Sequence, residues 1–241
     1  MKKVVLLILT LSFFQSCEVD DTGEICSDNC TSVIGKVIRA DNTGIANVKV
    51  TFSFVQFAPY SYTRNIAKTY TDDNGNYELI GFIKDRELGE LNNFRVSVKI
   101  DPIENALNDD FLKPSVFQPH ILPDINEIII PGVNNREQIE IADFIVPFKS
   151  DLTVRLNNFQ PIESVDNFRF RCDVQYGFVN QKFLVNFDET EQINQEFNFV
   201  TGIGANSVRI FKIKNGSSMN GEPQEVIVTD TPSNITLDFE Y

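Results

Sequence analysis

The sequence predicts an all-β protein made of two β-sandwich domains in tandem. Short segments in which apolar and polar residues alternate recur along the chain, and turns rich in Gly, Asn and Pro separate them. In Val48–Phe54, for example, Val and Phe alternate with Lys, Thr and Ser, which is typical of a strand with one buried face. The pattern restarts after Pro147 and Ser150, so we place the domain boundary there. Apart from this β character, no repeat links the two halves.

The first 16 residues are predicted to be a signal peptide. Two lysines precede the apolar run Val4–Phe14, which is far shorter than the roughly 20 residues that span a bilayer. The small residue Ser16 before Cys17 resembles a bacterial lipoprotein signal, in which Cys17 becomes the lipidated first residue of the mature chain. An ordinary secretory signal followed by an incidental cysteine is the alternative.

Residues 17–30 are expected to tether the first domain to the lipid. The acidic run Glu18–Asp21 resembles the signal that exports Bacteroidota lipoproteins to the outer face of the outer membrane, and a solvated spacer is the plainer interpretation. We therefore expect a lipid-anchored outer-membrane protein that faces the cell exterior. Because disulfides persist in exported proteins, Cys26 and Cys30 are a candidate disulfide.

The first sandwich is assigned to residues 31–149, and its clearest part is Val33–Leu79. A strand, a Gly-containing turn, a second strand and the sequence Thr-x-Thr-Asp-x-x-Gly-x-Tyr follow one another, and Asn-Gly turns suit tight hairpins. This order resembles the carboxypeptidase regulatory-like domain, a transthyretin-like β-sandwich. The matching residues are Gly35, Val37, Gly44, Val48, Val50, Thr69, Thr71, Asp72, Gly75, Tyr77 and Leu79. The resemblance implies a structural or recognition accessory and brings no catalytic residue.

The rest of the first domain contains further strands and one long loop. Strands are expected at 94–100, 127–130 and 138–146. Residues 101–126 carry four prolines and no sustained periodicity, so they form either a functional excursion or a loop that hides a short helix near 103–112.

The second sandwich is assigned to residues 150–241 and is expected to be immunoglobulin-like or fibronectin-like. Cys172 falls on the apolar face of one strand, which predicts a buried, inert thiol. The expected strands are 151–157, 168–176, 182–187, 193–198, 207–214, 224–229 and 235–241.

The sequence offers no constellation for catalysis. The formal charge is −13, or −15 once Lys2 and Lys3 are removed with the leader, which disfavours nucleic acid and anionic lipid as partners. The single histidine, His120, lies on the long loop and is expected to be solvated. Asp72 and Asp73 are assigned to a hairpin turn rather than to calcium. We predict no catalytic residue, cofactor or metal, and therefore no enzyme.

One loop is a candidate for ligand contact. Phe57, Tyr60 and Tyr62 lie between two strands, where aromatic rings can stack on sugars or anchor a peptide, or else fold back over the end of the sheet. We expect a non-catalytic binding or adhesion protein, attached to the membrane through lipid on Cys17, with a protein or glycan partner. A structural subunit of an envelope or fimbria-like assembly is the alternative, and a hydrolase is less favoured.

Overall fold

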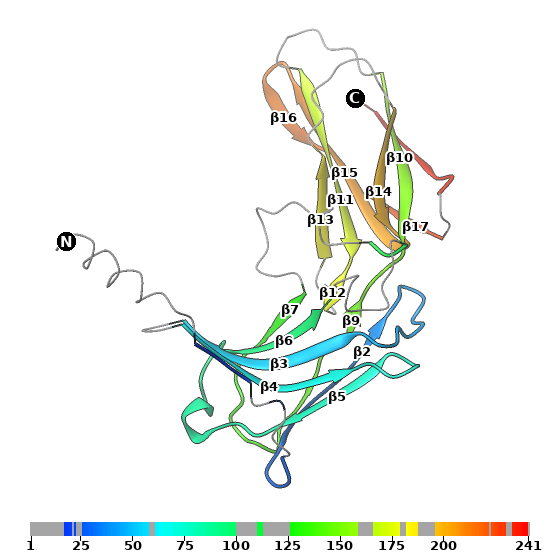
Figure 1. The fold of residues 1–241 in the computed structure, drawn as a ribbon. Coiled ribbons are helices and arrows are strands. Elements are labelled where there is room, and N and C mark those ends of the chain that lie inside the picture. The colour runs from blue at the N-terminus through cyan, green and yellow to red at the C-terminus, as the bar shows by residue number, and fades with distance from the viewer. Residues whose placement is uncertain are drawn as a thin grey trace, which may run out of the picture.

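A computed structural model of the chain describes residues 17–20, 22, 26–57, 61–99, 110–112, 126–158, 166–178, 182–187, 196–221, 223–229 and 233–240. These residues form strands, turns and one 3-10 turn, η2 (Asp85–Glu87), so the predicted all-β class is confirmed. The strands make four sheets, which stack in pairs as two sandwiches (Figure 1). Within the ranges given above, no helix has the length and apolar character needed to cross a membrane.

The first sandwich contains two five-stranded sheets. One follows the order β1-β4-β3-β6-β7, which are Cys17–Asp20, Tyr62–Tyr70, Lys49–Gln56, Phe94–Lys99 and Glu127–Ile130. The other is built on β2 (Thr31–Ile38), with β5 (Asn76–Gly81) on one side and the short strands β8 (Ile139–Ile141) and β9 (Phe144–Ile145) on the other. The predicted strand 138–146 is thus divided in two.

The second sandwich contains a three-stranded and a five-stranded sheet. The smaller one has β10 (Lys149–Asn157) between β14 (Glu196–Gly202) and β18 (Thr236–Glu240). In the larger one, β15 pairs with β11 on one side and with both β16 and β17 on the other. Its strands are β11 (Asn167–Gln175), β13 (Lys182–Phe187), β15 (Gly204–Lys214), β16 (Ser217–Asn220) and β17 (Gln224–Val228).

Both sandwiches have the same strand order. We count the strands along the chain without β1, β12 and β16, and we count β8 and β9 as one strand because both pair with β2. Each sandwich then has its fourth, first and seventh strands in one sheet and its third, second, fifth and sixth in the other. The first and seventh strands pair in parallel in both. An immunoglobulin constant domain instead places its first and second strands in one sheet. The second half therefore has the predicted sandwich architecture with the connectivity of the first half.

The cores follow from the alternation of the strands. In β10 and β18 every second residue is buried, because one face of each sheet packs inward. Phenylalanines occupy many inward positions, and their rings meet across strands: the centroids are 5.8 Å apart for Phe52 and Phe94 and 5.0 Å apart for Phe170 and Phe199. Each such side chain contributes about 1.5–3 kcal/mol through burial.

The sandwiches are joined by a strand as well as by the chain. The short strand β12 (Gly177–Phe178), from the second half, pairs with β9 in a sheet of the first sandwich. The fully buried Phe144 of β9 contacts the rings of Tyr176 and Phe178 at 5.7 and 4.9 Å. The amide of Ile203 donates a 2.8 Å hydrogen bond to the carbonyl of Phe148. The junction is therefore packed and hydrogen-bonded.

Some boundaries differ from the predicted ones. Residues 17–20, expected to begin a tether, form β1 on the edge of the first sandwich, paired in parallel with β4. Strand β14 continues to Gly202, four residues beyond the predicted end, and its predicted start at 193 lies outside the described residues. Most of the long loop 101–126 lies outside the described residues, but Phe111 forms a bridge with Phe148, and their ring centroids are 4.5 Å apart.

Candidate functional site

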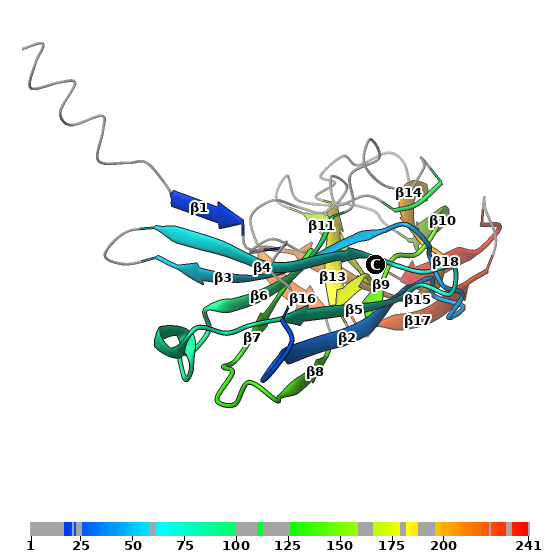
Figure 2. The ribbon, with the colours of Figure 1, turned by 60° about the horizontal axis from the view of Figure 1, so that its bottom comes forward.

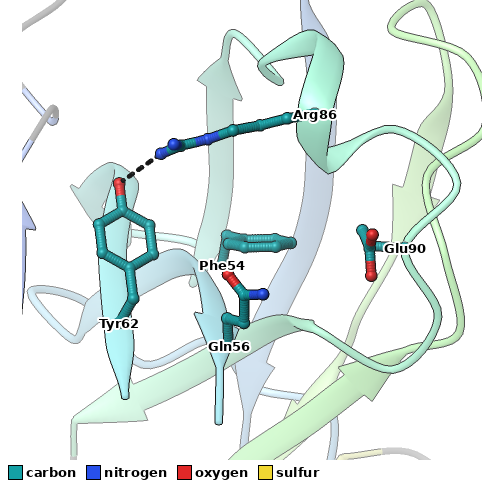
Figure 3. A pocket seen from close by; sticks show the side chains of 5 residues that line it. All are labelled: Phe54, Gln56, Tyr62, Arg86 and Glu90. Atoms are coloured by element: carbon teal, nitrogen blue, oxygen red, sulfur yellow. Dashed lines mark hydrogen bonds between the residues drawn. The ribbon is translucent and has the colours of Figure 1, made fainter. Parts of the chain in front are cut away.

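A pocket lies at the end of the first sandwich where β3 ends and β4 begins. It encloses about 240 Å³ and is lined by Phe54, Gln56, Tyr62, Arg86 and Glu90. The first three come from the two strands, and the other two come from η2 and the loop that follows it (Figure 3). The sheet thus supplies an apolar and aromatic base, and the loop supplies the charges.

Arg86 and Tyr62 form one wall of the pocket. The Arg86 guanidinium carbon lies 5.4 Å from the centroid of the Tyr62 ring, and its Nη2 donates a 3.3 Å hydrogen bond to the Tyr62 hydroxyl. Figure 3 shows the two side chains pointing toward each other across the opening, with Glu90 on the opposite side. A cation stacked on an aromatic ring still presents donors to a ligand. The pocket therefore combines a positive wall with a carboxylate across from it.

A buried ion pair fixes the loop that carries these charges. Arg64 Nε donates a 2.9 Å hydrogen bond to Glu87 Oε1, and Arg64 Nη2 contacts Glu87 Oε2. Both side chains are almost completely buried, and the amide of Lys84 donates to Glu87 Oε2 at 3.0 Å. Because two buried opposite charges hold each other, the η2 turn is pinned to β4. A second ion pair, Arg136 with Asp85, ties the turn to the loop before β8.

The edge of β8 is a second exposed feature of the first sandwich. Among the described strands, β8 pairs only with β2, so its far side is open. Ser32 N–H donates to Gln138 O and Ala142 N–H donates to Ile34 O, at 3.2 and 3.0 Å. Since backbone groups alternate along a strand, those of Ile139 and Ile141 point away from β2.

Apolar side chains accompany this open edge. Ile139 and Ile141 are 64 and 74% exposed, and Ile80 on the other side of β2 is 45% exposed. The pairing register places Ile80, Ser32 and Ile139 in one row across the sheet, with Ile34 and Ile141 in a second row. We call this apolar surface the β8 face. Clustered exposed apolar side chains of this kind often mark an interaction surface.

The predicted aromatic loop is only partly described. Tyr62 lines the pocket and is half-buried, whereas Phe57 is 69% exposed beyond the end of β3. The guanidinium carbon of Arg95 lies 6.0 Å from the Phe57 ring. Tyr60 lies outside the described residues. The structure thus places Tyr62 in the pocket and leaves Phe57 at the tip of the sandwich.

Of the described cysteines, only Cys17 lies beside the pocket. Cys17 is the first residue of β1 and pairs with Tyr62, so the predicted lipid attachment position is next to the pocket strand. Cys26 and Cys30 form a disulfide with their Cα atoms 5.8 Å apart. His120 lies outside the described residues. Among the residues that the structure does describe, no three His, Cys, Asp or Glu side chains gather as a metal site would require.

The motif that carries the family resemblance forms a structural clamp. Asp72 Oδ1 accepts hydrogen bonds from the amides of Asn74 and Asn76 at 2.9 and 2.8 Å, which closes the turn around Gly75 (φ 76°). These bonds, chiefly those from Asn76, lower the pKa of Asp72. Thr71 Oγ1 accepts from Val48 N–H and donates to Ile45 O. The Asp72 oxygens are therefore engaged in the turn itself.

Close backbone approach explains two further motif residues. The Tyr77 hydroxyl donates to the carbonyl of Ala142, and burial raises the pKa of Tyr77. A Cβ on Gly35 would lie 2.2 Å from the same carbonyl oxygen, so only glycine fits between them. These residues hold the second sheet together rather than facing a ligand.

Sequence reasoning did not identify Arg86, Glu90, the Arg64–Glu87 pair or the β8 face. The charged run Asp85-Arg86-Glu87 was a visible signal, but its partners in β4 are more than twenty residues away. The exposure of Ile139 and Ile141 could not be inferred from alternation, because Glu140 between them lies on the opposite face and is only half-buried.

Comparison with known proteins places the chain in no family. No family model and no curated protein matches it. Similar solved structures include a streptococcal ancillary pilin (12% identity, 89% of this chain and 62% of that one, TM-score 0.31). Others are the major pilin SpaD of Corynebacterium diphtheriae (11%, 86% and 67%, 0.31) and a DUF3823 family protein of Bacteroides ovatus (10%, 82% and 98%, 0.26). The chain spans 34% of the similar Bacillus anthracis TIE protein. Likeness at this level establishes neither a family nor a function.

Proposed function

We propose that this chain is a lipid-anchored, non-catalytic binding protein of the outer membrane that faces the cell exterior. Its partner is another protein, which adds an extended strand to the open edge of β8. The exposure of Ile139 and Ile141 beside unpaired strand backbone is the observation that carries the proposal. The anchoring rests on the sequence around Cys17, and the binding rests on β8.

Strand addition suits this edge for two reasons. The outward backbone groups of Ile139 and Ile141 supply the donors and acceptors that fix an added strand, and apolar side chains on the β8 face supply burial. The added strand would therefore alternate apolar side chains toward Ile139, Ile141 and Ile34. The same edge would be an aggregation hazard if it had no partner in the cell.

A foreign strand fits this edge better than the same strand of a second copy. Two β8 strands related by a two-fold axis, with Ile139 opposite Ile141, would place Glu140 directly opposite its own counterpart. Like charges opposite one another destabilise a strand pair. Glu140 also accepts a hydrogen bond from Gln138 Nε2, which holds its carboxylate beside the strand.

The pocket supports the binding of a polar ligand. Its groups are a guanidinium, a phenol, an amide, a carboxylate and a phenyl ring. This set can orient a polar ligand by hydrogen bonds and stacking, but it lacks a nucleophile next to a general base. We therefore assign no reaction to it.

Site-directed photo-crosslinking on intact cells tests the proposal. A benzophenone amino acid replaces Ile139 or, in a second strain, Ile227 of β17, which is 62% exposed on the other sandwich. We expect an adduct with a different protein from position 139, and the cross-linked peptide should lie in an extended segment of that protein. Ile141→Pro removes the outward amide without touching the ladder to β2, and should abolish the adduct. Ile141→Val is the matched control and should retain it.

Two outcomes would overturn the proposal. An adduct that survives Ile141→Pro would show that strand addition is not the mode of contact. Retention of a Cys17→Ala variant in the membrane fraction, or protection of the wild type from protease on intact cells, would reject the surface anchor.

A structural subunit is the second candidate, because each sandwich has an edge strand with an exposed isoleucine. Among the described strands β17 pairs only with β15, so the second sandwich also has a free strand with an exposed Ile227. A β17 edge that pairs with β8 of the next copy would make a head-to-tail contact, and such contacts build filaments. In that case positions 139 and 227 would both cross-link to this same chain, and the mass of the mature protein would rise with concentration.

A further inference from the structure

We propose that the pocket end of the first sandwich rests on the membrane surface, with Phe57 and Leu91 in the interfacial region of the bilayer and the second sandwich directed away from it. The proposal rests on the lipid anchor at Cys17. It adds an orientation and a second, direct lipid contact that the anchor alone does not require.

The position of Cys17 fixes which end is close to the lipid. Cys17 pairs with Tyr62, and Tyr62 pairs with Gln56, so the three residues form one row across β1, β4 and β3. Neighbouring strands are about 4.8 Å apart, which puts the Cys17 and Gln56 Cα atoms roughly 10 Å from each other. Because β1 begins at Cys17 itself, no spacer separates the acylated residue from the folded sandwich.

The most exposed apolar side chains of this end lie in the same row or just beyond it. Phe57 follows Gln56 directly and is 69% exposed, and Leu91 is 70% exposed. Leu91 belongs to the turn before β6, where the amide of Val55 donates to Asn93 O at 2.7 Å. Phe57 therefore lies near the lipid attachment point, and Leu91, which lies beside Gly132 after β7, is at the same end of the sandwich. An aromatic and a leucine side chain suit the boundary between headgroups and acyl chains.

The second sandwich is attached at the opposite end. It joins through β9, which pairs with the last residues of β2, Val37 and Ile38, next to the turn that leads to the start of β3. The eight residues of β3 span roughly 26 Å between the two ends. Figure 2 shows β1 beside β4 at one end of the first sandwich, with β10, β14 and β18 beyond the other end.

The charges at this end do not oppose such a contact. Arg64 and Arg95 are paired with Glu87 and Glu127, so their charges are balanced within the protein. Arg86 is exposed on the Tyr62 ring and can face lipid phosphates, with Glu90 opposite it. The chain as a whole is acidic, which repels anionic lipid. The contact is therefore apolar, and zwitterionic lipid is the appropriate test surface.

The absence of Trp from the sequence allows a direct measurement. Phe57→Trp introduces a single indole into the lipidated full chain, and Met219→Trp, on β16 of the second sandwich, is the control. Both proteins are reconstituted on phosphatidylcholine vesicles with and without brominated acyl chains. We expect emission from the Phe57→Trp indole to shift to the blue and to be quenched by the bromines. Emission from the control should be unchanged.

The outcomes distinguish failure of the proposed membrane contact from failure of the lipid anchor. If both variants float with the vesicles but neither indole is quenched, the anchor stands and the membrane-facing end is rejected. If neither variant floats, the anchor fails and the proposal fails with it. If a soluble glycan changes the emission of the Phe57→Trp indole and brominated lipid does not, position 57 contacts a sugar instead of the membrane. Leu91→Trp repeats the test should Phe57→Trp fail to fold.

Discussion

The two sandwiches share one strand order but bury different kinds of polar group. The first encloses an ion pair, Arg64 with Glu87, whose side chains are 2 and 0% exposed. The second encloses a neutral cluster in which Asn206 donates to the carbonyls of Gly202 and Gly204 at 2.9 and 3.0 Å. In the second sandwich Arg155 and Glu196 form an ion pair at the surface, 3.0 Å apart. The buried carboxylate of Asp166 there accepts a 2.8 Å hydrogen bond from the backbone amide of Asn215.

This difference shows that connectivity does not dictate the chemistry of the interior. The charged pair occurs where a loop outside the sheets must be held in place, because Glu87 belongs to η2 and Arg64 to β4. The neutral cluster lies between β14 and β15 and shapes the turn that joins them. The buried ion pair lies behind the pocket loop, and the buried amide of Asn206 lies at a strand connection.

The largest expected effect comes from breaking the buried charge. Glu87→Gln should lower the free energy of unfolding by about 3–5 kcal/mol, because it leaves the Arg64 guanidinium buried without its counter-charge. Urea unfolding followed by circular dichroism measures the change. Glu196→Gln, at the surface of the second sandwich, should leave the midpoint almost unchanged. Equal losses of unfolding free energy in the two variants would show that the buried ion pair is no more important than the surface pair.

An intermediate effect should appear in alkali, in the second sandwich. Burial, the main cause, raises the pKa of the Cys172 thiol from 9.0 to about 12. Between these pH values the unfolded chain releases a proton that the folded chain keeps, so the free energy of unfolding falls as the pH rises. Cys172→Ala should reduce this decline. Thermal melts from pH 8 to 11 measure this decline. If the melting temperature of Cys172→Ala falls with pH as steeply as that of the wild type, the thiol does not contribute.

The smallest effect is expected at the turn of the first sandwich. Hydrogen bonds, those from Asn76 first, lower the pKa of Asp72 below 3.8 in the folded chain. The stabilisation is therefore present at neutral pH and is lost as the pH falls below about 3.8. Asp72→Asn should lower the melting temperature at pH 7 more than at pH 3. Asp73→Asn, one residue further along, is the control for removing a carboxylate from the same turn.

Features that depend on near neighbours were predictable from the sequence. The Asp72 turn is closed by residues within four positions, so Asp, Asn and Gly in that order predict it directly. Most strands of both halves follow from alternation, although β1, β12 and β16 were not predicted. The inward position of Cys172 follows from its place in β11. Each of these rests on one strand or one turn.

Features that depend on distant pairing were not predictable. The β8 face exists because Ile139 is brought next to Ser32, more than a hundred residues earlier. The alternation of apolar and polar residues predicts which face of a strand is buried, but it does not predict which strand lies beside it. The shared strand order of the two halves could not be predicted for the same reason. The halves connect their strands in the same order, but their sequences show no repeat that would reveal it.

The strand β12 makes the two halves of the chain depend on each other structurally. A chain cut after Lys149 would leave the edge of β9 without its partner and would uncover Phe144, whose ring packs on Tyr176 and Phe178. Neither half could be shuffled into another gene as a ready-made module without new residues to seal that edge.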